Sequence, residues 1–357
     1  MLRAVRLLAA VPALIAATAT TGLAQDSVAL QANVLFYGDN TEFRNPFREG
    51  ETIFGAAVRL TAVAGIGDRT TLTLGAFGNQ RFGSEKGFDL ARPVVSVTIR
   101  GARSSFTFGT LPISSHAGAA GPDLNGPHGL LPPIQRETLA FDRPYEAGLQ
   151  WLFAGRRLRQ DVWLDWQRVN TRDHRERFDA GVNGAFGLTG PFTIPYQAHI
   201  VHEGGQLFRS GPVADSQSGA AGVSLRGRLG ALDTVQVEAF GLATRFVPDR
   251  ASPERDRNGA GFLGRASAER AGWRAHLLVW RGWDFITEEG DPNYLSIRRD
   301  GSRYGGTRDY SEVGLTRLFQ PAPGVTIHAS GRVHRIEEHY EYSYRILAVV
   351  GAEWKVK

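Results

Sequence analysis

The chain has 357 residues, of which 42% are hydrophobic and 22% are charged, and it contains no cysteine. The lack of cysteine excludes disulfides, thiolate metal sites and cysteine nucleophiles. The formal net charge is +5, but acidic residues are interspersed with basic ones along the whole chain, so we expect no nucleic-acid partner.

The first residues match a secretory signal peptide. Two arginines precede an apolar stretch over residues 7–17, and the small residues Gly22 and Ala24 suit a signal peptidase. We expect a signal peptide over residues 1–24 and one mature domain over residues 25–357. No run of about 18 apolar residues follows the signal peptide, so the mature chain has no candidate transmembrane helix.

From residue 28 onward, apolar and polar residues alternate with a period of two, which predicts strands with one apolar face. Every second residue of 28–36 is apolar in the first segment. In the last segment the apolar face holds every second residue of 342–356, and Ser343 and Arg345 lie on the opposite face. Many of these segments reach about ten residues, a length that suits tilted membrane strands of about 9–11 residues better than globular strands of about 5–6.

Short turns alternate with longer polar loops along the chain. The tight turns fall near residues 66–69, 101–104, 155–156, 190–191, 230–233, 271–272 and 321–324. The longer loops fall near residues 40–51, 81–89, 112–137, 170–176, 204–217, 246–258, 287–308 and 337–341. Because an open sheet edge in lipid would leave backbone groups unpaired, we expect an all-β fold. We expect a closed antiparallel transmembrane β-barrel of about sixteen strands, with short periplasmic turns and long extracellular loops.

The segment 25–357 resembles the bacterial outer-membrane β-barrels, and among them the sixteen-strand porin-like class. Its most motif-like piece is the last strand, where Gly351, Trp354 and Val356 match the glycine and spaced hydrophobic residues that the barrel-assembly machinery of this class binds. The chain departs from that pattern because it ends in Lys357 instead of an aromatic residue. The resemblance implies a location in the bacterial outer membrane, contact with outer-membrane lipid and lipopolysaccharide, and assembly as a homotrimer.

Charged residues on the polar face of the strands form the expected pore lining. The residues assigned to it are Arg59, Arg100, Arg159, Asp161, Asp165, Arg226, Arg228, Glu238, Arg274, Arg332 and Arg345. Rings of charge set the ion preference of a pore, so we expect a porin-like channel for passive diffusion of small polar or mildly anionic solutes. Cross-strand salt bridges that solvate the wall are the other interpretation of these charges. A substrate-specific export or uptake barrel, for example for a polysaccharide, is the alternative function.

The longest loop, residues 112–137, is the third extracellular loop. In the porin-like class this loop folds inward and narrows the channel. By that resemblance Asp123, His128, Gln135 and Arg136 are the expected constriction residues. A lid or surface loop outside the barrel is the other interpretation, since long structureless loops are usually functional or disordered.

The sequence offers only weak candidates for catalysis. His199 and His202 are three residues apart on an expected strand, so they point to opposite faces and do not form a metal site. Ser114 and His116 are too close in the chain to act as nucleophile and base without a separate third partner. We therefore predict no catalytic residue, no metal, no cofactor and no enzymatic activity. An outer-membrane hydrolase acting on lipid or peptide is kept as a further alternative.

Overall fold

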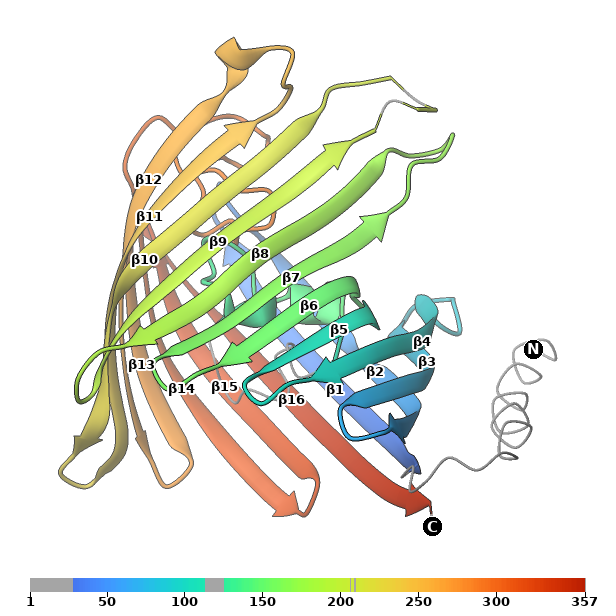
Figure 1. Cartoon of the computed structure of the whole chain (residues 1–357). Coiled ribbons are helices and arrows are strands. Elements are labelled where there is room, and N and C mark those ends of the chain that lie inside the picture. Colours follow the sequence, from blue (N-terminus) through green and yellow to red (C-terminus); the bar gives the residue numbers. More distant parts are fainter. Residues whose placement is uncertain (1–27, 113–124, 206, 209, 357) are drawn as a thin grey trace.

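Sixteen antiparallel strands form a closed barrel (Figure 1). The structure is a computed structural model that describes residues 28–112, 125–205, 207–208 and 210–356. Each strand is hydrogen bonded to its neighbours in the sequence, and β1 (Val28–Arg44) pairs with β16 (His339–Val356) to close the ring. The predicted fold class and strand number are confirmed, and the predicted signal peptide lies outside the described residues.

The connections alternate in length as predicted, and several strands, among them β1 and β16, are longer than the sequence pattern indicated. The other strands are β2 (Glu49–Ile66), β3 (Thr70–Arg81), β4 (Leu90–Arg100), β5 (Ser104–Thr110), β6 (Ala147–Ala154), β7 (Leu158–Arg168), β8 (Glu176–Gly187), β9 (Phe192–Gly204), β10 (Ala214–Leu229), β11 (Leu232–Val247), β12 (Arg257–Arg270), β13 (Trp273–Trp283), β14 (Arg308–Ala322) and β15 (Val325–Ile336). The predicted loop over 40–51 is shorter than expected, because β1 and β2 pair almost to their joining residues. Among the described residues, no helix has the length and apolarity needed to cross a membrane.

The barrel wall has two chemically different faces because successive residues of a strand point to opposite sides. On β16, Tyr342, Tyr344 and Ile346 are more than half exposed, whereas their neighbours Glu341 and Leu347 are buried. The exposed residues face away from the lumen, and none of the residues that the structure describes covers them. This outer face therefore matches the lipid-facing band of a membrane barrel.

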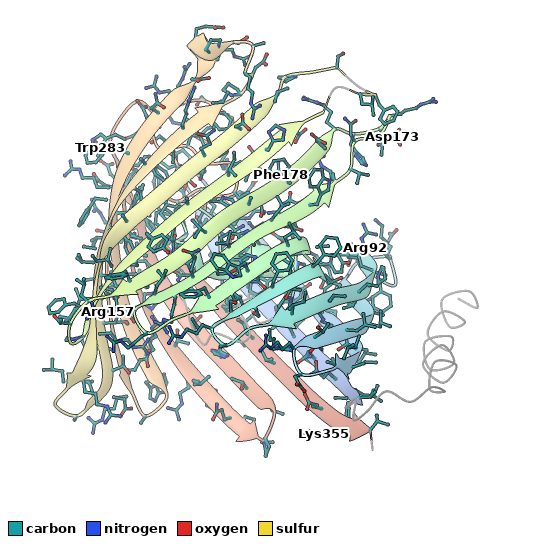
Figure 2. The ribbon with its side chains drawn as sticks, viewed as in Figure 1. Arg92, Arg157, Asp173, Phe178, Trp283 and Lys355 are labelled. Atoms are coloured by element: carbon teal, nitrogen blue, oxygen red, sulfur yellow. The ribbon has the colours of Figure 1, made fainter. Side chains whose placement is uncertain are left out.

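Aromatic side chains mark the two ends of this outer face. Figure 2 shows Trp283 on the outer surface toward the end with the long loops, and Lys355 at the end with the short turns. Trp354, next to Lys355, is likewise exposed on the outside. Such pairs of aromatic bands are typical of the two membrane–water interfaces of a barrel.

Two loops fold into the barrel and pack inside its lumen at mid-height. The first is the plug, residues 125–146, which carries η2 (Pro127–Gly129) and α2 (Leu139–Asp142); the second is the β13–β14 loop, residues 284–307. Leu130, Leu131 and Ile134 of the plug have no exposed surface. They join one apolar cluster with inward residues of the wall and of the β13–β14 loop, namely Trp163, Phe240, Leu263, Leu278, Trp280, Phe285, Tyr294 and Leu295.

The plug and the β13–β14 loop are also hydrogen bonded to each other. The backbone N–H of Arg136 donates to the Glu289 carbonyl at 2.8 Å, and the N–H of Asp291 donates to the Pro132 carbonyl at 2.9 Å. Burial of their apolar side chains needs these pairings, because an unpaired buried backbone group is costly. The two loops therefore form one packed unit inside the wall.

A charge placed on the outer face tests the orientation of the wall. Leu315 lies outward in the middle of β14, whereas Val356 lies outward at the end of β16. We expect Leu315→Arg to lower the free energy of unfolding by about 2–4 kcal/mol and the matched Val356→Arg by about 0–1 kcal/mol, because the cost of a charge falls from the bilayer centre to the interface. Urea unfolding in lipid vesicles measures both values, and equal losses would contradict the assigned lipid face.

Candidate functional site

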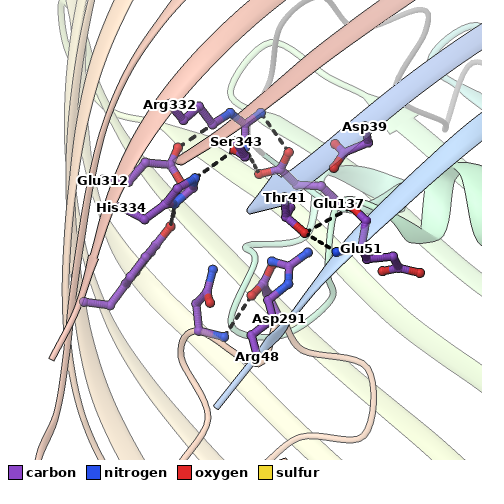
Figure 3. A network of polar contacts seen from close by, with 12 residues as sticks. Asp39, Thr41, Arg48, Glu51, Glu137, Asp291, Glu312, Arg332, His334 and Ser343 are labelled. Atoms are coloured by element: carbon purple, nitrogen blue, oxygen red, sulfur yellow. Dashed lines mark hydrogen bonds and ion pairs between the residues drawn. The ribbon is translucent and has the colours of Figure 1, made fainter. Parts of the chain in front are cut away.

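A polar cluster lies in the long-loop half of the lumen, where three neighbouring strands meet the plug (Figure 3). Glu312 comes from β14, His334 from β15 and Ser343 from β16. The strand register places Glu312 opposite His334, and Ser343 opposite Arg332, which is two residues from His334. All of these side chains point into the lumen, so adjacent strands bring together groups that are far apart in the sequence.

Ser343, His334, Tyr310 and Glu312 form one chain of hydrogen bonds. The Nε2 atom of His334 lies 2.8 Å from Ser343 Oγ, and its Nδ1 atom lies 2.8 Å from Tyr310 Oη and 3.3 Å from the Glu312 carboxylate. Tyr310 donates its hydroxyl proton to Glu312 at 2.6 Å and therefore accepts one from Nδ1. This places the histidine proton on Nδ1 and leaves Nε2 free to accept the proton of Ser343. A hydroxyl, a base and a group that orients the base are the elements of an activated nucleophile.

The carboxylate of Glu312 is held on its other side as well. His276 Nε2 lies 2.7 Å from the second carboxylate oxygen, and Arg332 Nε lies 3.8 Å from the same atom. Glu312 is 4% exposed. A buried carboxylate with several partners keeps one orientation, so Glu312 fixes the ring of His334.

Two arginines beside Ser343 hold a carboxylate of the plug. Arg332 donates two hydrogen bonds of 3.0 Å to Glu137, and Arg345 contacts both Glu137 and Asp39. Burial disfavours the charged form of Glu137, but Arg332 and Arg345 outweigh this effect and lower its pKa to about 2. The site thus contains two arginines, both paired with Glu137, next to Ser343.

A small space lies within this cluster. It has a volume of about 20 Å³ and is lined by Ser343, His334 and the two arginines, which is room for about one water molecule. A larger cavity of about 420 Å³ at the long-loop end is lined by the β1–β2 loop and shares Arg48 and Thr138 with the inner space. Arg48 and Thr138 therefore lie between the space beside Ser343 and the larger cavity.

The plug is anchored to the wall by a second buried charge cluster. His128 lies between Glu146 and Asp161, with 2.8 Å from each ring nitrogen to a carboxylate, and its ring stacks on Trp163 at 4.0 Å. Its φ is +55°, a conformation that needs support from the surroundings. Burial lowers the pKa of His128, but the two carboxylates outweigh this effect and raise it from 6.5 to about 10.

The residues predicted to line a pore are spread over several parts of the barrel. Arg59 and Arg100 line a cavity of about 500 Å³ at the short-turn end, and Arg159, Asp161 and Glu238 line a neighbouring one of about 750 Å³. Asp165 accepts a backbone hydrogen bond from Ala147, Arg274 pairs with Glu269 at 3.8 Å, and Arg226 and Arg228 are exposed near the end of β10. Arg332 and Arg345 belong to the Ser343 cluster.

The predicted constriction residues have different surroundings. His128 and Gln135 are buried in the plug, and Arg136 pairs with Asp142 at 3.1 Å. Asp123 lies outside the described residues, as do Ser114 and His116. The described part of the predicted loop therefore packs inside the barrel.

Comparisons with solved structures identify the class of protein. OmpTdeltaL8, a loop-deletion mutant of OmpT, an outer membrane protein of Vibrio cholerae, matches with a TM-score of 0.56 and 10% identity over 92% of this chain and 99% of that chain. An anion-selective porin from Comamonas acidovorans matches with a TM-score of 0.54 and 11% identity over 92% of this chain and 100% of that chain. OccK11 (OpdR) from Pseudomonas aeruginosa matches with a TM-score of 0.53 and 12% identity over 92% of this chain and 96% of that chain. At these identities the likeness shows the fold alone. Together with the family match given next, this fold makes the chain a bacterial outer-membrane β-barrel, in contact with the lipid and lipopolysaccharide of that membrane.

The sequence profile of the lipid A 3'-O-deacylase-type family matches residues 19–357, and the chain belongs to this family. A comparison with curated proteins finds no match. The prediction of no enzymatic activity is wrong, because the family is one of deacylases, which are enzymes. That prediction depended on serine and histidine residues close together in the sequence, whereas the described cluster joins residues from three strands.

Sequence reasoning missed Ser343, His334 and Glu312 as a group. The alternation placed Ser343 and His334 on the polar faces of their strands, but it gave no register between the strands. Pairing the last two strands across their short connection would have set Ser343 opposite Arg332. The signal was thus the combination of inward position and hairpin register.

The raised pKa of His128 predicts how the plug responds to pH. Because the folded-state pKa of about 10 exceeds the ordinary 6.5, the stabilisation by His128 is complete below pH 6.5 and is lost as the pH rises through 10. We expect protease cleavage within the plug to accelerate between pH 9 and 11, flanking that pKa, while the barrel stays intact by its heat-dependent gel mobility. In His128→Gln the plug should be cleaved readily at every pH; a persistent pH response in this variant would contradict the assignment.

Proposed function

We propose that this protein is an outer-membrane acyl-ester hydrolase in which Ser343 is the nucleophile and His334 is the general base. The observation that carries the proposal is the hydrogen bond from Ser343 Oγ to His334 Nε2, with the opposite ring nitrogen turned toward Tyr310 and Glu312. The membership of the chain in a deacylase-type family supports the same chemistry. A channel would have no need of this arrangement.

The geometry supports a two-step acyl transfer. His334 Nε2 accepts the proton as Ser343 Oγ attacks the ester carbonyl carbon, and the protonated ring then gives this proton to the departing alkoxide. Water, deprotonated by the same nitrogen, hydrolyses the acyl-serine and releases a fatty acid. Glu312 stabilises the positive charge on the ring in both steps. Arg332, opposite Ser343 in the register, is suited to stabilise the negative charge on the carbonyl oxygen.

The height of Ser343 in the wall favours a lipid substrate of the outer leaflet. Tyr342 and Tyr344, its neighbours on β16, point outward and are exposed. Exposed aromatic residues gather at the membrane–water interface of barrels. The ester bonds of a glycolipid lie near this interface, between the sugar and the acyl chains. We infer that the substrate is an acyl ester of lipid A. We infer that it enters through the 420 Å³ cavity at the long-loop end, which has Arg48 and Thr138 in its lining.

Removal of the nucleophile tests the proposal directly. We expect Ser343→Ala to lower the release of fatty acid from purified lipid A by about 10³-fold or more, because loss of the nucleophile removes the covalent route. Ser330, an inward serine on β15 outside the hydrogen-bonded chain, provides the matched control Ser330→Ala with an unchanged rate. Mass spectrometry of the product measures the rates. Full activity in Ser343→Ala would overturn the assignment of the nucleophile.

A diffusion channel for small polar or mildly anionic solutes is the second candidate. The two cavities at the short-turn end, with Arg59, Arg100 and Arg159 in their linings, favour it. The apolar cluster around Leu130 and Leu131 opposes it, because this cluster packs plug side chains against inward residues of the wall.

Conductance separates the two candidates. We expect purified native protein to give no stepwise conductance in planar bilayers, because water and ions have no continuous path through an apolar packed region. A deletion within the plug that leaves the barrel folded should create steps and serves as a positive control for insertion. Regular steps from the native protein would favour the channel.

Three finer expectations stay predictions. They are binding of the assembly machinery to the last strand through Gly351, Trp354 and Val356, the homotrimer, and substrate-specific export or uptake. None of them is required by the hydrolase.

A further inference from the structure

A second group of ligand-type side chains meets in the middle of the lumen, apart from Ser343. Asp179 comes from β8, His199 from β9 and Glu289 from the β13–β14 loop. His199 Nε2 lies 4.0 Å from Asp179 Oδ2 and 3.9 Å from Glu289 Oε2, and the three ligand atoms are all within 4.8 Å of one another. All three residues are buried.

The ring nitrogen of His199 that faces the two carboxylates has no hydrogen-bond partner among the described residues. His199 is 5% exposed, so water does not solvate this nitrogen freely. A buried polar atom without a partner costs about 1–3 kcal/mol. Neither charge state of the ring resolves this cost: a lone pair would be repelled by the carboxylates, and a proton would be too far from them for a hydrogen bond. A cation between the three groups satisfies all of them.

The space between the three atoms has the size of a metal site. For a triangle with these sides, the central point lies at most about 2.5 Å from each corner. Zinc binds imidazole nitrogen and carboxylate oxygen at about 2.0–2.2 Å, so a movement of a few tenths of an ångström completes the coordination. A ligand set of one imidazole and two carboxylates suits zinc better than calcium, which takes oxygen ligands.

The two carboxylates are already oriented by outer hydrogen bonds. Trp163 Nε1 donates to Asp179 Oδ1 at 3.1 Å, Arg143 donates to Glu289 Oε1 at 2.6 Å, and Gln135 of the plug donates to Glu289 Oε2 at 3.0 Å. Outer partners of this kind are a regular feature of metal sites.

We propose that Asp179, His199 and Glu289 bind one divalent transition-metal ion, with Zn²⁺ as the best fit, that ties the β13–β14 loop and the plug to the barrel wall. Glu289 connects both loops, since its carbonyl accepts the backbone N–H of Arg136. The ion is structural and lies apart from Ser343, so the proposal does not depend on the hydrolase.

The metal content of the full-length protein tests this site. We expect protein that is purified in detergent, exposed to Zn²⁺ and desalted to keep about one zinc per chain, measured by mass spectrometry of the elements. His199→Gln should lose it. His202→Gln is the matched control: His202 lies on the same strand but faces outward and pairs with Asp215 at 2.8 Å, so this variant should keep the zinc. Retention of zinc by His199→Gln, or zinc-free native protein, would overturn the proposal.

A second measurement avoids the risk that His199→Gln does not fold. Chelation of the native protein should raise the rate of protease cleavage in the β13–β14 loop by about tenfold or more, and Zn²⁺ should restore protection, because a ligand that binds only the folded state stabilises it. X-ray absorption of the zinc-loaded protein should give a shell of nitrogen and oxygen with one imidazole. Chelation without effect on cleavage, or a shell without imidazole, would refute the site.

Discussion

In hydrocarbon, each backbone N–H and C=O needs a partner within the protein, and the rest of this structure depends on that requirement. The pairing of β1 with β16, from Val28 opposite Val356 to Glu42 opposite Tyr342, removes the last free sheet edge. Closure at sixteen strands encloses a lumen that wall side chains alone do not fill. The plug and the β13–β14 loop occupy this space, so the apolar cluster of this molecule lies inside the cylinder.

A filled lumen takes charged groups out of water, and each of them then needs partners. Arg308 has no exposed surface; it pairs with Glu337, donates to the carbonyls of Leu295 and Asn293 at 2.9 and 2.8 Å, and lies 3.4 Å above the ring of Phe47. Glu137 between two arginines and His128 between two carboxylates follow the same rule. Because such pairs are costly to separate, they give each inward loop one defined position. Apolar packing alone defines the position of a loop less strictly.

The sequence predicted the wall because the wall obeys a local rule. Alternation over 342–356 assigned each residue of β16 to one face, and the lengths of the connections set the strand number. The same rule failed at residues 40–51, where polar residues such as Thr41 were assigned to a loop although Thr41 faces inward in a paired strand. The site needed more, because Ser343 and His334 become neighbours only through register, and Glu137 and Glu289 reach the wall only through the paths of their loops. His199 and His202 do face opposite sides, as expected; the groups that approach His199 come from β8 and from a loop ninety residues further along the chain.

The inward loops have opposite consequences for the two candidate functions. A passive pore requires a continuous wet path, and the packing of Leu130, Leu131 and Ile134 against Trp163 and Trp280 inside the barrel opposes such a path. An ester hydrolase gains from the same packing, because exclusion of bulk water strengthens the interactions of Glu312 with His334 and keeps Ser343 in one orientation. Ser343, His334 and Glu312 sit on paired strands, which position side chains more accurately than loops do. The packed loops that oppose a passive pore are therefore the ones that would make the Ser343 cluster effective.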